Sequence, residues 1–335
     1  MNIFIVSPNL VWGGAATANM AIAQMLSGNH RVYYNDEYNE VAINNVEYDS
    51  YLTHQTKDSK RFVDYLLSLN IDCVIWGISM NLPYYRQATR MLNRKGVKQC
   101  VLFHSLAITN NVKGKMMEVL TAVSLKYIDH LVFVSKYTDS SWSSKYRAIR
   151  NHPSHHVIYN PINTEDESFC KESCRRIGFV GRFSEEKQPE LFAQLSLCDD
   201  ANSYIAWGDG PLRAELMKKY SKVNFKGMSS NQKEIYESID VLVMTSTFEN
   251  CPMVILEAWK YGIPCVVPNV GGIPEIVSDN ISGRLYNEFS VGAISSCIAD
   301  VQKDYAQYSV NCRINVQKFS FDKLYEQWSK LIKGR

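Results

Sequence analysis

Short runs of β-branched and aromatic residues alternate along this chain with longer stretches of helical periodicity. Strands that are apolar along their whole length and separated by helices are typical of parallel sheets covered on both faces. The pattern stops at a polar stretch, residues 163–173, and then starts again. Two sets of similar length predict an α/β protein in which two Rossmann-like, doubly wound parallel-sheet domains face each other across a cleft. The expected strands are residues 3–6, 31–34, 73–76, 100–103, 131–134 and 157–159 in the first set, and 176–180, 204–207, 223–225, 241–244 and 265–267 in the second.

The polar stretch also sets the expected domain limits. A chain of 335 residues can form two domains of ordinary size. We expect a first domain over residues 1–163 and a second over residues 174–318. The remaining residues, 319–335, contain an amphipathic helical pattern that could pack back on the first domain or cap the second.

Charge and cysteine content exclude several classes of protein. The net charge is +2, and residues 1–165 carry sixteen Lys and Arg against twelve Asp and Glu, which is too weak an excess for a nucleic-acid-binding domain. The apolar start of the chain lacks a basic leader, so it predicts a first strand and not a signal peptide. Nine cysteines without a CxxC pair favour free thiols in a reducing compartment. We therefore expect a cytoplasmic protein with no nucleic-acid partner.

Two glutamates, Glu249 and Glu257, give the first indication of a ligand. Pro252 suits the first turn of a helix and Gly262 suits the position after its end. Glu249 would then precede the helix, and Glu257 would lie inside it. The exposed amides and positive dipole end of the helix would lie between the two carboxylates, and such a terminus binds anions. A nucleotide sugar has the matching order of groups, because its diphosphate lies between ribose and sugar.

Basic and glycine-rich segments follow other expected strands, and ligands of open α/β sheets bind at the carboxyl ends of strands. Arg182 and Lys187 follow the strand at 176–180 and suit two phosphates, Arg as a fork and Lys as a point charge. Gly13-Gly14 follows the first strand and allows backbone amides to approach a ligand closely. That pair is not part of a GxGxxG fingerprint, and a turn with unusual dihedral angles is an equal alternative.

Five segments of the second half together resemble a known family. They are Gly181-Arg182 with Lys187, Gly208-Asp209-Gly210-Pro211, Glu249 and Glu257 with seven residues between them, Gly262-x-Pro264, and Gly271-Gly272-x-x-Glu275. Their order and spacing resemble the retaining GT-B glycosyltransferases of family 4 across residues 175–290. The first half is similar more loosely, through Gly13-Gly14, Phe103-His104, Val134-Ser135 and Tyr159-Asn160-Pro161.

The resemblance implies a role for each matched position. Arg182 and Lys187 would hold the donor diphosphate, Glu249 the donor sugar, and Glu257 the ribose hydroxyls. His104, at the carboxyl end of the fourth expected strand, would lie near the transferring sugar. The residues expected at catalysis are His104, Arg182, Lys187 and Glu249. Those expected to bind the donor are Gly13, Gly14, Gly181, Gly208, Lys226, Gly227, Met228, Asn250, Cys251, Pro252, Met253, Val254 and Glu257.

By the same resemblance, the chain would move a hexose-type sugar from a UDP- or GDP-linked donor to a glycan or lipid-linked acceptor. The expected setting is bacterial surface polysaccharide assembly: O-antigen, capsule or lipopolysaccharide. No cofactor is expected, since cations of the protein would hold the donor. Two alternatives are a GT-B sugar-nucleotide epimerase or phosphorylase, and a non-catalytic sugar-binding protein. Retention of all four charged residues (Arg182, Lys187, Glu249, Glu257) disfavours the non-catalytic one.

Two further groups of residues leave alternatives open. His152, His155 and His156 surround Pro153, where a solvated loop is favoured over a metal site because no Cys or carboxylate completes a ligand set. The second group recurs every four residues after Pro83 and consists of Arg86, Arg90, Arg94 and Lys98. On a helix the arginines form a basic row, which suits either a solvated face or contact with an anionic membrane or a lipid-diphosphate acceptor. In the second case the protein would work at the inner face of the plasma membrane.

Overall fold

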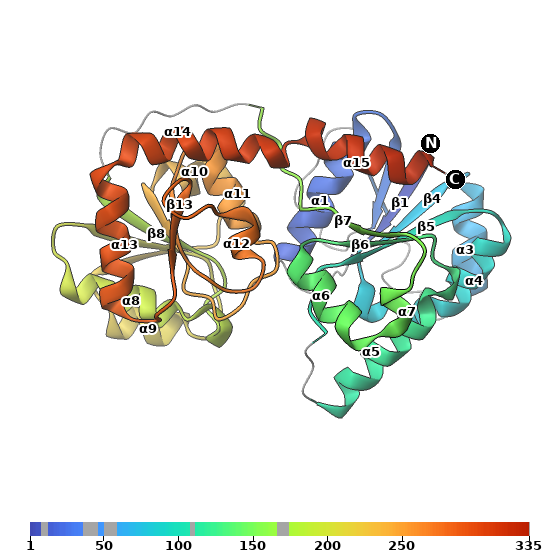
Figure 1. The fold of residues 1–335 in the computed structure, drawn as a ribbon, viewed down its shortest axis with the longest axis horizontal. Coiled ribbons are helices and arrows are strands. Elements are labelled where there is room, and N and C mark those ends of the chain that lie inside the picture. The colour runs from blue at the N-terminus through green and yellow to red at the C-terminus, as the bar shows by residue number, and fades with distance from the viewer. Residues whose placement is uncertain (8–12, 36–45, 50–58, 108–110, 166–173, 335) are drawn as a thin grey trace. The chain divides into compact units, whose positions relative to one another are not determined.

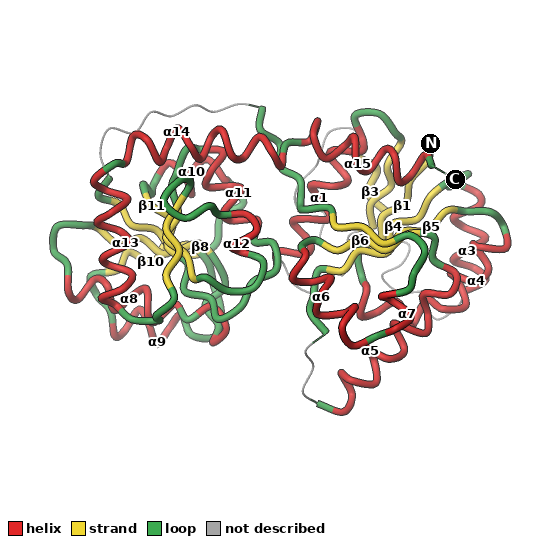
Figure 2. The backbone as a smooth tube through the Cα atoms, in the orientation of Figure 1, coloured by secondary structure: helices red, strands yellow, loops and turns green. Residues whose placement is uncertain are grey.

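The structure is a computed structural model. It describes residues 1–7, 13–35, 46–49, 59–107, 111–165 and 174–334. The chain divides into two compact units, unit 1 over Met1–Asn163 and Phe321–Arg335, and unit 2 over Thr164–Ser320. In each unit, helices surround a central sheet (Figure 2). Among the described residues, no helix combines the length and apolar character that spanning a bilayer requires.

Unit 1 contains a seven-stranded parallel sheet of order β3-β2-β1-β4-β5-β6-β7, in which the strand order reverses between β1 and β4 (Figure 1). Its strands are β1 (Asn2–Val6), β2 (Arg31–Asn35), β3 (Val46–Asp49), β4 (Cys73–Trp76), β5 (Lys98–Phe103), β6 (His130–Phe133) and β7 (His155–Val157). Its α-helices are α1 (Gly14–Ser27), α3 (Ser59–Ser68), α4 (Arg86–Arg94), α5 (Val112–Ser124), α6 (Lys136–Lys145), α7 (Arg147–Arg150) and α15 (Phe321–Lys333). Two 3₁₀ helices are η1 (Ser79–Tyr85) and η2 (Leu125–Tyr127).

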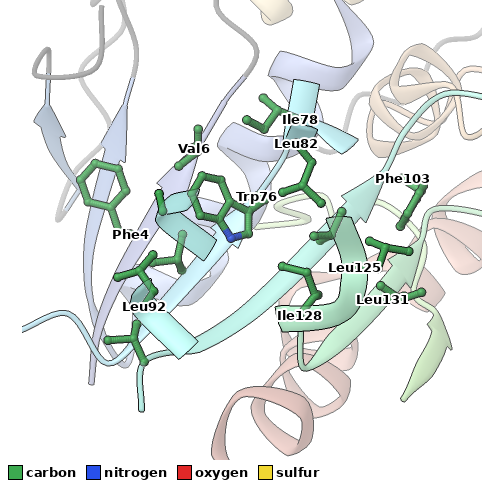
Figure 3. Close-up of a cluster of buried hydrophobic side chains, with 14 of the residues drawn as sticks. Phe4, Val6, Trp76, Ile78, Leu82, Leu92, Phe103, Leu125, Ile128 and Leu131 are labelled. Carbon is green, nitrogen blue, oxygen red and sulfur yellow. The ribbon is translucent and has the colours of Figure 1, made fainter. Parts of the chain in front are cut away.

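Alternate residues of the unit 1 strands form one continuous core. Side chains two positions apart point to the same face of a sheet, so Phe4 and Val6 of β1 lie beside Trp76 of β4 in the cluster (Figure 3). Leu92 of α4 and Leu125 of η2 cover this face. Ile3 and Ile5, which point to the other face of β1, are also fully buried. This strand is therefore apolar on both faces, as the sequence pattern predicts for a doubly covered parallel sheet.

The last helix, α15, packs in unit 1 beside α1 (Figure 1). Its apolar face is buried, with Trp328 only 1% exposed. Lys98, at the start of β5, donates hydrogen bonds to the carbonyl oxygens of Ile332 and Gly334. A lysine at these last carbonyls complements the negative end of the helix dipole.

Unit 2 contains a six-stranded parallel sheet of order β10-β9-β8-β11-β12-β13, which reverses between β8 and β11. Its strands are β8 (Arg176–Val180), β9 (Ser203–Trp207), β10 (Val223–Gly227), β11 (Val241–Val243), β12 (Cys265–Pro268) and β13 (Gly283–Tyr286). Its helices are η3 (Glu185–Lys187), α8 (Pro189–Cys198), α9 (Arg213–Lys219), α10 (Gln232–Glu237), α11 (Met253–Lys260), α12 (Ile273–Ile276), α13 (Val291–Lys303), α14 (Tyr305–Val316) and η4 (Gln317–Phe319).

Every strand expected from the sequence overlaps an observed one, but β3 and β13 were not expected. Both are edge strands of their sheets. Val46-Glu47-Tyr48-Asp49 and Gly283-Arg284-Leu285-Tyr286 each include charged residues, so neither shows the continuous apolar run of a central strand. Because β3 precedes β4, the strand before His104 is the fifth and not the fourth.

Candidate active site

The predicted residues of unit 2 gather at the carboxyl edge of its sheet. Arg182 and Lys187 follow β8, Gly208 follows β9, and Glu249 follows β11. The strand order reverses between β8 and β11, and ligands of open α/β sheets bind outside the strand ends at such a switch point. This edge is therefore the candidate donor-binding side of unit 2.

Lys187 and Glu249 form an ion pair at this edge. The ammonium of Lys187 donates to Oε1 of Glu249, and their side chains are 30% and 11% exposed. The family resemblance gives the lysine to phosphate and the glutamate to sugar, and in the structure the two side chains are in contact. A cation and a carboxylate in contact can hold the phosphate and the neighbouring hydroxyl groups of one ligand.

Two threonines after β11 hold the Lys187 turn in place. The backbone N–H of Thr247 donates to the carbonyl oxygen of Glu186 at 2.9 Å. Oγ1 of Thr245 lies 2.7 Å from the carbonyl oxygen of Lys187 and 2.8 Å from that of Gln188. Gln188 has φ +44°, a left-handed conformation that is uncommon for a residue other than glycine. The β11 loop thus fixes both Lys187 and the strained residue after it.

Glycines allow the loops after β8 and β9 to meet. A Cβ on Gly208 would lie 1.9 Å from the carbonyl oxygen of Gly181, so only glycine fits there. The N–H of Gly208 also donates to the carbonyl oxygen of Gly227, at 2.7 Å. Gly227 is buried, whereas the flanking Lys226 and Met228 are exposed at the end of β10. The three strand-end loops therefore form one connected surface.

Gly271 sets the position of Glu249. Gly271 has φ +59°, and a Cβ on it would lie 1.9 Å from the carbonyl oxygen of Glu249. The N–H of Gly272 donates to the same carbonyl oxygen at 2.9 Å. The glycine pair that follows β12 thus supports the backbone of Glu249 directly.

Helix α11 begins between the two glutamates. Pro252 is its N-cap, with an extended backbone, one position before the first turn where the sequence predicts it. Gly262 follows the end of the helix with φ +68°, as the sequence predicts. Cys251, Pro252 and Met253 are buried, while Asn250 and Val254 are half-buried. No acidic side chain lies in the first turn, so its positive end is not neutralised there.

Glu257 lies inside α11 and is only 8% exposed. Tyr236 donates its hydroxyl to Oε2 of Glu257 at 2.6 Å, and Gln232 donates its amide to Oε1 at 3.2 Å. Burial raises the pKa of the Glu257 carboxyl, and the Tyr236 hydrogen bond acts in the opposite direction. Each carboxylate oxygen keeps one further acceptor position, which a ribose hydroxyl could use.

Arg182 is exposed and forms no ion pair with any residue that the structure describes. The Ser184 hydroxyl, which donates to Glu186 at 2.6 Å, is the main cause of the lowered pKa of Glu186, and the charges of Lys187 and Arg182 lower it further. Within the described part of the chain, Arg182 is thus a cation at the strand edge that no carboxylate pairs with.

In unit 1, the predicted loop after β1 is described only in part, because residues 8–12 lie outside the described residues. Gly13 is the N-cap of α1, and Gly14 is its first residue. Both are exposed, and a Cβ on Gly14 would meet no atom within 4 Å. The start of α1 carries no acidic side chain in its first turn. A ligand can therefore approach the backbone at Gly14.

His104 follows β5 and is part of a buried polar network. Its Nε2 lies 2.8 Å from Oδ1 of Asn19, and Nδ2 of Asn19 donates to Ser7 and to the carbonyl oxygen of Gly77, both at 3.3 Å. Because Oδ1 only accepts, Nε2 of His104 carries the proton. Burial lowers the pKa of His104 to about 4, so the imidazole is neutral at physiological pH.

The basic row differs from the prediction at one position. Arg86, Arg90 and Arg94 are exposed on α4, but Lys98 lies in β5 and binds the end of α15. Its ammonium is held by backbone carbonyls and does not extend the row.

The histidines near Pro153 interact with protein groups. His155 pairs with Asp139 at 2.7 Å, His152 contacts the carbonyl oxygens of Ser154 and Ile128, and His156 contacts the Ser154 hydroxyl. Within the described ranges of the chain, no group of three His, Cys, Asp or Glu side chains could hold a metal ion.

Several positioning residues were not predicted: Thr245, Thr247, Asn19, Gln232 and Tyr236. The two threonines follow a strand end directly, so the polar run Thr245-Ser246-Thr247 was a usable signal. The others lie on helices, where sequence alone does not show which side chain they approach.

Comparison with known proteins agrees with this architecture. Residues 174–304 match the family described as "Glycosyl transferases group 1". The chain is 24% identical to the Campylobacter jejuni GalNAc-alpha-(1->4)-GalNAc-alpha-(1->3)-diNAcBac-PP-undecaprenol alpha-1,4-N-acetyl-D-galactosaminyltransferase, over 99% of this chain and 98% of that protein. It is 29% identical to the Escherichia coli UDP-Gal:alpha-D-GlcNAc-diphosphoundecaprenol alpha-1,3-galactosyltransferase, over 40% of this chain and 38% of that one.

Among solved structures, Anabaena Alr3699/HepE in complex with UDP-glucose has a similar fold. The TM-score is 0.80 at 15% identity, over 100% of this chain and 99% of that one. The predicted fold class, GT-B, and the predicted family are therefore confirmed. These similarities support a glycosyltransferase of the group 1 type.

Proposed function

We propose that this enzyme transfers a hexose-type sugar, with retention of configuration, from a UDP- or GDP-linked donor to a glycan or lipid-linked acceptor. The observation that carries the proposal is the Lys187–Glu249 pair beside Arg182 at the β8/β11 switch point of unit 2. In support, the names of both relatives above specify a saccharide linked through a diphosphate to undecaprenol. We place the reaction in the assembly of bacterial surface polysaccharides.

In the proposed mechanism, Arg182 and Lys187 bind the donor diphosphate, and the start of α11 faces the same group. As the bond between sugar and phosphate lengthens, negative charge grows on the leaving phosphate, and these positive groups stabilise it. The acceptor hydroxyl attacks the anomeric carbon on the face that the phosphate leaves. Its proton passes to the leaving phosphate oxygen, so the protein needs no strong base, and no cofactor is required.

Other residues position the donor and acceptor. Glu249 binds the sugar hydroxyls, Glu257 binds the ribose, and the segment 225–228 lies beside the base. Neutral His104, held by Asn19, binds the transferring sugar. The enzyme works at the inner face of the plasma membrane, where the exposed arginines of α4 contact anionic lipid headgroups.

A donor screen with single-residue variants tests the proposal. Purified enzyme is incubated with UDP- and GDP-sugars, and release of the nucleotide is measured. With the active donor, Arg182→Ala or Lys187→Ala should lower turnover about a hundredfold, as expected for loss of one contact to the transition state. Lys222→Ala is the matched control, because Lys222 pairs with Asp200 at the amino end of β10. Normal turnover in both site variants would refute the diphosphate assignment.

A further inference from the structure

Helix α5 turns its apolar residues outward. Five large apolar side chains of this 13-residue helix are between 38% and 86% exposed. They are Val112, Met116, Val119, Leu120 and Val123. Single exposed apolar residues are ordinary on a soluble protein, but a group of them on one helix marks a contact surface. We call this group the α5 apolar face.

The inward side of α5 is polar, and its polar groups have partners. Glu118 is 1% exposed and accepts a hydrogen bond from the hydroxyl of Tyr146 at 2.7 Å. Thr121 is fully buried and donates to the carbonyl oxygen of Ser79 in η1 at 3.2 Å. Rotating the helix to bury its apolar residues would expose these polar groups and break their hydrogen bonds. The outward position of the apolar face is therefore fixed by the fold.

The arrangement around the helix is that of an interfacial amphipathic helix. At 3.6 residues per turn, the five apolar residues fall within an arc of about 100°. Lys113 and Lys115, both exposed, lie at the two borders of that arc. Such a helix, apolar on one face with lysines at its margins, lies at a membrane surface with its apolar side in the headgroup boundary.

The charge of the surrounding segment fits an anionic surface. Residues 79–150 contain twelve Lys and Arg and only three Asp and Glu. All three carboxylates bind protein groups, Glu118 with Tyr146, Asp129 with the backbone N–H of Gln99, and Asp139 with His155. Of the neighbouring elements, α7 packs beside α5 (Figure 1) and carries exposed arginines at both ends. Lys145 lies 4.0 Å from the Glu118 carboxylate. The exposed basic side chains of α5 and α7 form no ion pair with any described residue.

We propose that the α5 apolar face docks the enzyme on an anionic membrane leaflet, with Lys113 and Lys115 on the lipid headgroups. A second copy of the chain is a poorer partner, because a two-fold contact would bring the lysine borders of two α5 helices together. This inference rests on the proposed function, in which the enzyme works at the plasma membrane. It places the main membrane contact on α5, whereas the sequence indicated only the arginines of α4.

Vesicle sedimentation tests the proposal. The full chain is mixed with vesicles of equal parts phosphatidylcholine and phosphatidylglycerol, and the bound fraction is measured. Val119→Gln together with Val123→Gln should lower partitioning about tenfold or more, because two apolar side chains no longer enter the boundary. Lys113→Gln together with Lys115→Gln should lower it about fivefold for each lysine at low salt, and less at high salt.

Matched controls distinguish binding through the α5 apolar face from nonspecific binding by exposed apolar residues, and from effects on catalysis. Val310→Gln with Ile314→Gln changes two exposed apolar residues, one helical turn apart on α14, and should leave binding unchanged. Vesicles of phosphatidylcholine alone should bind the parent chain weakly. Turnover of the nucleotide sugar without vesicles should be unaffected by the α5 variants, since α5 contributes no residue to the donor site. Vesicle binding without turnover would refute the proposed function and leave the docking surface standing.

Three results would overturn the inference. The parent chain would fail to bind anionic vesicles, or the Val119/Val123 variant would bind them as well as the parent does. Alternatively, light scattering would show a dimer that this variant converts to a monomer, which would assign the face to a second copy. If the enzyme is active and any of these results is obtained, the proposed transferase function stands and only the docking surface is rejected.

Discussion

Replacing Gly271 by alanine should damage the active site through the backbone of Glu249. The new Cβ would lie 1.9 Å from the Glu249 carbonyl oxygen, where contacts under 3.0 Å essentially never occur. The two atoms must separate by about 1 Å, and the Glu249 loop moves with its carbonyl. The left-handed backbone adds about 1–2 kcal/mol, and overpacking adds about 1–3 kcal/mol. We expect the free energy of unfolding to fall by about 2–5 kcal/mol in total.

The effect on turnover should be large even where the protein remains folded. A displacement of about 1 Å at a positioning residue can lower the rate about a hundredfold. Urea unfolding followed by tryptophan fluorescence measures stability, and nucleotide release from the active donor sugar measures turnover. Gly271→Asn provides a second variant, because asparagine tolerates the left-handed conformation but still carries a Cβ. It should keep more stability than Gly271→Ala while losing similar activity.

Gly292→Ala is the matched control for both measurements. Gly292 lies in the first turn of α13, and a Cβ there would meet no atom within 4 Å. Alanine should leave turnover unchanged and raise stability by at most about 1 kcal/mol. If Gly271→Ala instead behaved like Gly292→Ala, the contact between Gly271 and Glu249 would not position the site.

Three further changes test other parts of the structure. Glu257→Ala should weaken binding of the free nucleoside diphosphate in calorimetry, because the ribose loses an acceptor; unchanged binding would argue against that role. Burial lowers the pKa of His104 to about 4, so neutral His104 contributes its full stabilisation above pH 6.5. The free energy of unfolding should fall by about 3 kcal/mol as the pH drops to 4. His104→Gln should remove that dependence from urea titrations. Lys98→Met should lower stability by about 1 kcal/mol and speed hydrogen exchange in α15, whereas exposed Lys95→Met should do neither.

Much of the fold could be predicted from the sequence because central parallel strands are apolar on both faces. Cys73–Trp76 and Arg176–Val180 have the predicted limits. The edge strands β3 and β13 could not be recognised, since an edge strand with charged residues lacks that continuous apolar run. The order of the strands, which creates the β8/β11 switch point, is a property of topology that no local pattern contains.

The amphipathic helix α5 shows a second limit. Apolar periodicity alone predicts a helix with its apolar face buried. Here Glu118 and Thr121 are buried because Tyr146 and Ser79 provide hydrogen bonds, and the apolar face is exposed as a result. The identity of a helix's buried face depends on the partners that the tertiary structure supplies, which periodicity does not reveal.

The arrangement of the candidate site also depends on residues that lie far apart in the sequence. Spacing places Lys187 and Glu249 after neighbouring strands, and the resemblance gives one the phosphate and the other the sugar. Their ion pair follows from the β11 loop, where Thr245 and Thr247 hold the carbonyl groups of the lysine turn. A donor diphosphate would compete with Glu249 for the same ammonium, so binding of phosphate should release the carboxylate toward the sugar hydroxyls. Under the proposed roles, Lys187 would exchange its carboxylate partner for phosphate when the donor binds.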